Sequence, residues 1–106
     1  LSPLDPLFYG MLTNQMVAEV ALGEFDAAMA SAEQAVNSPG AYYYPLIWAA
    51  ITAELSGKPA RMQRWRDKAL SEWPDASADA ILQTFPLSDI NLKHNVLASL
   101  HRMGIT

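Results

Sequence analysis

One spacing constrains the fold of this chain more than any other feature. When the sequence is shifted by 34 residues, Gly57 falls on Gly23 and Ala69 falls on Ala35. Self-similarity at a fixed period of roughly 20 to 50 residues is typical of arrays in which one supersecondary unit stacks on the next. We therefore expect two copies of one structural unit.

Nearly every stretch between glycine and proline residues shows helical spacing of its apolar side chains. The alternation of apolar and polar residues that marks a strand is found nowhere in the sequence. An all-α fold of about six helices is therefore predicted. The predicted helices run from Pro6 to Gly23 with Asp5 as cap, from Gly23 to Pro39, from Pro45 to Gly57, from Pro59 to Trp73, from Ser77 to Thr84 and from Ser88 to Met103.

The third predicted helix is apolar on all sides over residues 46–51, which indicates that other elements cover it from several directions. Ser77 and Ser88 are the expected caps of the last two helices, and Gly104 is the expected residue just after the last one. On that last helix, Ile90, Leu97 and Leu100 are expected to face inward and seal the fold.

Composition restricts the class of protein. A chain of 106 residues has the length of one domain, here residues 1–106, and 51% hydrophobic residues is too apolar for a disordered chain. The longest apolar run, residues 45–53, is far shorter than the roughly 20 residues that cross a bilayer. The absence of cysteine fits a cytoplasmic protein. Because the chain begins at Leu1 without a basic leader, we expect it to be part of a longer protein.

The charge of −4 is unevenly distributed, since residues 1–57 contain no lysine or arginine. Residues 58–68 contain five of the seven basic residues, and three of these, Arg61, Arg64 and Lys68, share one face of a helix. This basic strip is either a solvated outer face or a patch for an acidic partner. The net negative charge argues against a nucleic-acid partner.

The sequence shows no motif for catalysis or cofactor binding. His94 and His101 are seven residues apart on one helix, which is too far for both to bind one metal ion without a ligand between them. Glycine-rich phosphate loops and zinc-protease motifs are absent. We therefore expect no enzyme activity, no cofactor and no metal.

Three features of the chain are the 34-residue period, the glycine between two helices and the small residues after that glycine. In these features the chain resembles the tetratricopeptide repeat (TPR) family. In that pattern, an aromatic residue lies two positions after the glycine, alanines follow it, and a proline ends the unit. The second unit departs from the pattern at Pro59 and Met62, and in the first unit Pro39 comes one position early. The matching residues are Gly23, Phe25, Ala28 and Ala35 in the first unit, and Gly57, Ala69 and Pro74 in the second.

The opening Leu1–Pro6 and the tail from Phe85 to Ile105 look like the C-terminal TPR segment of bacterial adenylate cyclases and winged-helix transcriptional regulators. The resemblance implies a right-handed superhelix of antiparallel helix hairpins. Its repeats would span about 9–42 and 43–76, with capping helices over 77–106. It also implies a non-catalytic interaction or regulatory module of a bacterial signalling or transcriptional regulator, whose output domain lies elsewhere.

In the TPR family, the first helix of each repeat lines a concave surface that binds protein or peptide segments. The aromatic residues among the corresponding positions here either bind a partner or pack between repeats. A small-ligand sensor, with a closed pocket of a few hundred Å³ lined by Tyr44 and Trp48, is the alternative function. The positions that map to the concave surface are Asn14, Val17, Tyr44, Ile47, Trp48 and Ile51.

Besides the basic strip and the concave surface, a third interaction surface is expected at the amino-terminal end. A helix pair cannot bury its own apolar faces, so arrays need several units or a cap. The first predicted helix has no preceding unit in this sequence, and its apolar face is expected to be open. Such a face predicts self-association into a dimer through Leu7, Phe8, Met11 and Leu12.

Overall fold

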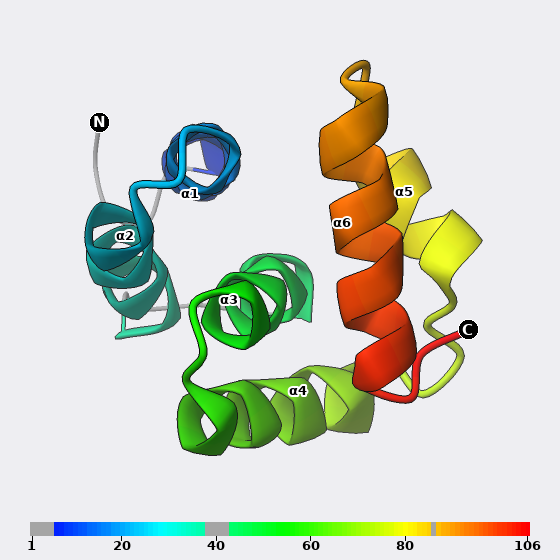
Figure 1. Cartoon of the computed structure of the whole chain (residues 1–106). Coiled ribbons are helices and arrows are strands. Elements are labelled where there is room, and N and C mark those ends of the chain that lie inside the picture. Colours follow the sequence, from blue (N-terminus) through cyan, green and yellow to red (C-terminus); the bar gives the residue numbers. More distant parts are fainter. Residues whose placement is uncertain (1–5, 38–42, 86) are drawn as a thin grey trace.

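A computed structural model describes the backbone of residues 6–37, 43–85 and 87–106, together with their side chains apart from residues 6–10 and Thr84. Within these ranges all regular secondary structure is helical, as the spacing predicted. Figure 1 shows the six helices of this part of the chain. They are α1 (Pro6–Ala21), α2 (Phe25–Asn37), α3 (Tyr43–Leu55), α4 (Pro59–Glu72), α5 (Ala78–Thr84) and α6 (Ile90–Arg102).

The α1–α2 and α3–α4 turns are copies of each other at the predicted offset. Gly23 and Gly57 have φ angles of 74° and 71°, in the left-handed region that glycine enters without a steric penalty. Four backbone hydrogen bonds of the first turn recur 34 residues later. Among them, the amide of Glu24 donates to the Glu19 carbonyl at 2.9 Å, and the amide of Lys58 donates to the Ala53 carbonyl at 2.9 Å. The repeat in the sequence is thus a repeat in backbone geometry.

Helix α3 is the centre of the molecule. It contacts α1, α2, α4 and α6, and every residue from Pro45 to Ala53 is buried (Figure 1). Its alanines, such as Ala49 and Ala50, are fully buried, and small side chains let neighbouring helices approach closely. The prediction of a helix covered on several sides is confirmed. The helix begins at Tyr43, two residues before the predicted Pro45.

The ends of α5 and α6 follow local capping chemistry, with one correction. The Ser77 hydroxyl accepts a hydrogen bond from the amide of Ala80 at 3.1 Å, as predicted for the cap of α5. Helix α6 is capped by Asp89 and not by the predicted Ser88, because the Asp89 carboxylate accepts from the amide of Leu92 at 2.8 Å. Gly104 has φ 79° just after α6, as predicted. The predicted cap Asp5 and the stop signal Pro39–Gly40 lie outside the described residues.

Helix α6 runs across α1 and α3, and α5 lies on the outer side of α6 (Figure 1). The three residues that were expected to seal the fold differ in how deeply they are buried. Leu100 is fully buried, Leu97 is half-buried, and Ile90 is 60% exposed, so the prediction for Ile90 is wrong. Ile90 is the first residue of the helix. None of the described helices has the length and apolar content that a bilayer crossing requires.

Candidate interaction surface

The α1–α3 face that was predicted to be an open concave surface is covered by α6. Asn14 is exposed and Val17 is half-buried, but Ile47, Trp48 and Ile51 are at most 2% exposed. The prediction that these three residues present a free surface is therefore wrong for this arrangement. The last helix, expected to be a capping helix, lies across the first helices of both hairpins, where Leu92 and Val96 meet side chains of α1 and α3.

The contact between α6 and this face is apolar. Leu92 and Val96 of α6 surround a cavity of only about 10 Å³ together with side chains of both hairpins. Leu100 lies a further turn along α6, and residues spaced by four share one side of a helix. We call the covered face the groove. It is formed by Val17 and Val20 of α1 with Trp48, Ile51 and Thr52 of α3.

Trp48 is the largest buried side chain of the groove, and it packs against Phe85 with ring centroids 5.3 Å apart. Its indole nitrogen is buried, and it has no hydrogen-bond acceptor among the described residues. Tyr44 is half-buried, and the ring of Tyr43 packs against Trp73 in a tilted arrangement with the ring centroids 4.9 Å apart. These aromatic rings pack within the molecule. The cavity at Trp48 has room for about one water molecule and is not lined by Tyr44, so among the described residues it is not the closed ligand pocket predicted beside Tyr44 and Trp48.

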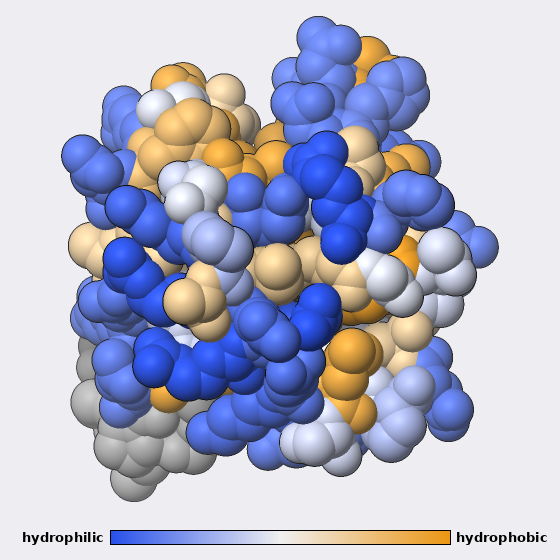
Figure 2. Space-filling view, turned by 60° about the horizontal axis from the view of Figure 1, so that its bottom comes forward, coloured by the Kyte–Doolittle hydropathy of each residue, from blue (hydrophilic) through white to orange (hydrophobic). Residues whose placement is uncertain are grey.

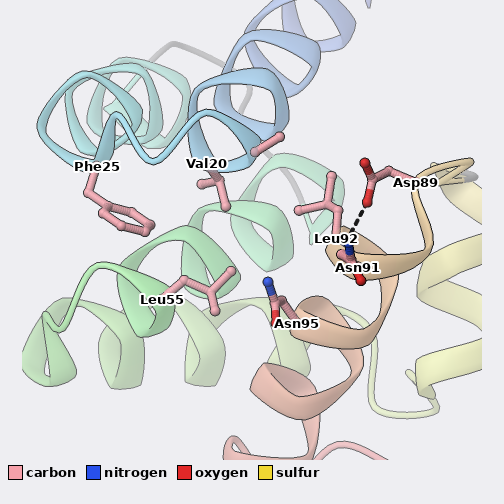
Figure 3. Close-up of a pocket in the computed structure, with 8 residues that line it drawn as sticks. Val20, Phe25, Leu55, Asp89, Asn91, Leu92 and Asn95 are labelled. Carbon is pink, nitrogen blue, oxygen red and sulfur yellow. Dashed lines mark hydrogen bonds between the residues drawn. The ribbon is translucent and has the colours of Figure 1, made fainter.

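A larger hollow lies at the amino-terminal end of α6. It measures about 260 Å³ and opens between the first hairpin, α3 and α6. Figure 3 shows Val20, Phe25 and Leu55 on one side and Asn95 of α6 on the other. Asn91 also lines the hollow. Apolar walls therefore face polar amides across this space.

The carboxyl-terminal end of α6 is held by an ion pair. The Arg102 guanidinium donates through Nε and Nη2 to the two carboxylate oxygens of Glu54, each at 2.7 Å. This two-bond geometry fixes direction as well as distance. Hydrogen bonding from Arg102 lowers the pKa of the Glu54 carboxyl, against an opposing effect of burial. The pKa of Arg102 is raised by the same contact.

The lowered pKa of Glu54 predicts a pH dependence of stability. A carboxyl whose pKa is lower in the folded chain stabilises it above the unfolded value, here 4.5, and loses that effect as the pH falls through the folded value. Glu54→Gln should therefore lower the free energy of unfolding by at most about 1 kcal/mol near pH 7, since Arg102 is largely exposed. Urea unfolding of both proteins at several values between about pH 3 and 7 measures the difference, because carboxyl groups titrate in this range.

This difference should shrink as the pH falls through the folded pKa of Glu54, which lies below 4.5. Glu72→Gln is the matched control, because Glu72 is an exposed glutamate at the end of α4. A constant difference between the Glu54 variant and the parent at every pH would show that the ion pair does not act in the folded chain.

The basic strip lies on α4. Arg61 pairs with Glu33 of α2, so one of its three cations is used within the fold. Arg64 and Lys68 are exposed and line a hollow of about 300 Å³ with Trp65. Figure 2 brings the α4 side forward and shows mostly hydrophilic residues, with small apolar patches between them. Arg64 and Lys68 thus present their side chains at the surface, where an acidic segment could bind them.

The predicted self-association face is only partly described. Met11 is 57% exposed, as expected, but Leu12 is 5% exposed because it belongs to the hydrophobic core. Leu12 is therefore not available to a second copy, which corrects that part of the prediction. The side chains of Leu7 and Phe8 lie outside the described residues.

Sequence reasoning missed the residues that connect α6 to the rest of the molecule. Glu54 and Arg102 are 48 positions apart, and nothing in their neighbourhoods signals a pair. In the sequence, the positions of Asn91 and Asn95 indicate only an ordinary polar side of a helix. His94 and His101 are exposed, and in the described part of the chain no three histidine, aspartate or glutamate side chains gather closely enough to hold a metal ion.

Comparisons of the chain with models of protein families, with curated proteins and with solved structures find no match.

Proposed function

We propose that this chain is a TPR-like, non-catalytic module that binds a protein or peptide segment within a bacterial signalling or transcriptional regulator. The observation that carries the proposal is the recurrence of the glycine turn, with its positive φ and its hydrogen bonds, 34 residues apart. A helix hairpin repeated in this way is the unit of solenoid scaffolds, whose common role is to present extended surfaces to partners. A right-handed superhelix is compatible with the packing of α1, α2, α3 and α4.

Three surfaces support an interaction role. The first is the groove, which accepts an amphipathic helix in the form of α6. The second is the α4 hollow with Arg64 and Lys68, which would suit an acidic segment. The third is the exposed side of α1 at Met11, where a second copy would dock to form a dimer. We propose no nucleic-acid partner, because the chain carries a net charge of −4.

Selection of peptides from a random display library against the full chain tests this function. An interaction module yields peptides with a shared pattern, and their binding weakens by about tenfold or more when a residue of one surface is changed. Val17→Ala probes the groove, Arg64→Glu probes α4 and Met11→Glu probes α1. Ala30→Ser, an exposed position on α2, is the control. Absence of enrichment, or binding indifferent to all three substitutions, would contradict the proposal.

The hollow of about 260 Å³ favours a small-ligand sensor as the second candidate, since it lies between the repeats and the last helix. Thermal shift against a library of small amphipathic molecules tests it. A sensor gives ligands whose stabilisation disappears when Asn95→Leu fills the hollow. Stabilisation unaffected by that change would place the ligand elsewhere.

A further inference from the structure

We infer that the groove is a receptor for an amphipathic helix, and that α6 fills it as an imperfect internal ligand that a better-matched helix of a partner displaces. This inference rests on the proposed interaction function and names the site and the chemistry of its partner. The required helix has apolar residues at the positions of Leu92, Val96 and Leu100, and a cation at the position of Arg102. It also has apolar residues where α6 carries Asn91 and Asn95.

The apolar anchors define the spacing of the ligand. Leu92 and Val96 meet both α1 and α3 around a cavity of about 10 Å³, so the fit at these positions is tight. Leu100 is fully buried one turn later. Anchors at every fourth residue along one side are the usual pattern by which a groove recognises a helix. A partner helix therefore needs large aliphatic residues with this spacing.

The ion pair defines the direction of the ligand. Glu54 stands at the end of α3, and its carboxylate receives two hydrogen bonds from Arg102, two residues after the last anchor. The side chain of Glu54 is only 15% exposed, whereas that of Arg102 is 53% exposed. The carboxylate of Glu54 is thus largely buried, whereas the guanidinium of α6 is largely exposed. A cation at this position sets which end of a helix lies at Glu54.

Two features make α6 a poor match for the same groove. The buried indole nitrogen of Trp48 has no acceptor among the described residues, and a buried unsatisfied donor weakens the bound state. In addition, Asn91 and Asn95 line the hollow of about 260 Å³ opposite Val20, Phe25 and Leu55, so α6 brings polar amides and no apolar side chain at these two positions (Figure 3). A helix with leucines at those two positions would place apolar side chains opposite these residues.

The test uses the full chain and a labelled peptide that corresponds to residues 88–104, with leucine in place of Asn91 and Asn95. Fluorescence anisotropy should show saturable binding of this peptide. The unmodified peptide should bind at least about tenfold more weakly, because two apolar contacts are missing. Asn95→Leu in the chain should raise the melting temperature and weaken peptide binding by a similar factor, because α6 then competes better. His94→Leu, on the exposed side of α6, is the control and should weaken binding little.

A charge exchange identifies the groove as the site. In the Glu54→Arg chain, the leucine-containing peptide should bind at least about tenfold more tightly when it also carries Arg102→Glu, since that peptide pairs opposite charges whereas α6 of the chain is repelled through its own Arg102. Circular dichroism checks that the variant chain remains helical. Should the Glu54→Arg chain unfold, the Asn95→Leu chain, which is expected to be more stable, decides the question alone.

Three results would overturn the inference. These are no binding of the leucine-containing peptide to the parent chain, binding unchanged by Asn95→Leu, and equal binding of the unmodified peptide. The last result would show that α6 of a second copy is the natural occupant. Display-selected peptides that depend on Arg64 and not on Val17 would keep the proposed function while removing the groove as its site.

Discussion

Trp48→Ala should destabilise the chain by about 3–5 kcal/mol, the cost of removing a large aromatic side chain from a close-packed core. Trp48 is 1% exposed and lies where α3 meets α6 and Phe85. A domain of this size is stable by only about 5–15 kcal/mol, so the variant would lose a large part of its folding free energy. Urea unfolding followed by circular dichroism measures the change.

Trp48→Phe is the informative control for this prediction. Phenylalanine keeps an aromatic ring in the core and removes the indole nitrogen that has no acceptor in the described structure. Its cost should be clearly smaller than that of alanine, because removal of a buried unsatisfied donor offsets part of the lost packing. If Trp48→Ala stays within about 1 kcal/mol of the parent, the ring is not a core residue, and the burial of α3 by α6 is wrong.

Leu100→Ala should cost about 2–5 kcal/mol, the range measured for buried leucines whose cavity does not fully collapse. The side chain is fully buried on α6, close to the end that Arg102 fixes to Glu54. The loss should appear in chemical denaturation as a lower midpoint with an unchanged slope, because the folded chain exposes the same surface on unfolding.

Ile90→Ala, a control on the same helix, should change the free energy of unfolding by no more than about 0.5 kcal/mol, since Ile90 is 60% exposed. Both substitutions replace a large aliphatic residue by alanine on one helix, so the contrast isolates burial. Equal effects of the two variants would mean that α6 does not dock through the side that carries Leu100.

The parts of the fold that depend on local chemistry could be predicted from the sequence. Glycines in the left-handed region, Gly23 and Gly57, follow the ends of α1 and α3, and the hydroxyl of Ser77 caps α5. The 34-residue offset also predicted that the two turns share one geometry, because identical turns need glycine at the same position. Local signals failed where two residues compete for one role, as Ser88 and Asp89 do at the start of α6.

The candidate site depends on where α6 docks, and periodicity does not determine this. An amphipathic helix with Leu92, Val96 and Leu100 on one side fits the end of a stack as well as the face across it. The sequence pattern therefore predicts an open surface at Ile47, Trp48 and Ile51, which the fold buries. The pairing of Glu54 with Arg102 is a long-range contact, and neither residue alone indicates it.

The uniform burial of α3 has a consequence for amide hydrogen exchange. Its residues from Pro45 to Ala53 are buried, so the helical amides from Ile47 to Ala53 should exchange only when the whole chain unfolds. Amides of α6, with one exposed side, should exchange through smaller openings that leave the hairpins intact. The ratio of the two rates would give the free energy that separates release of the last helix from loss of the entire structure.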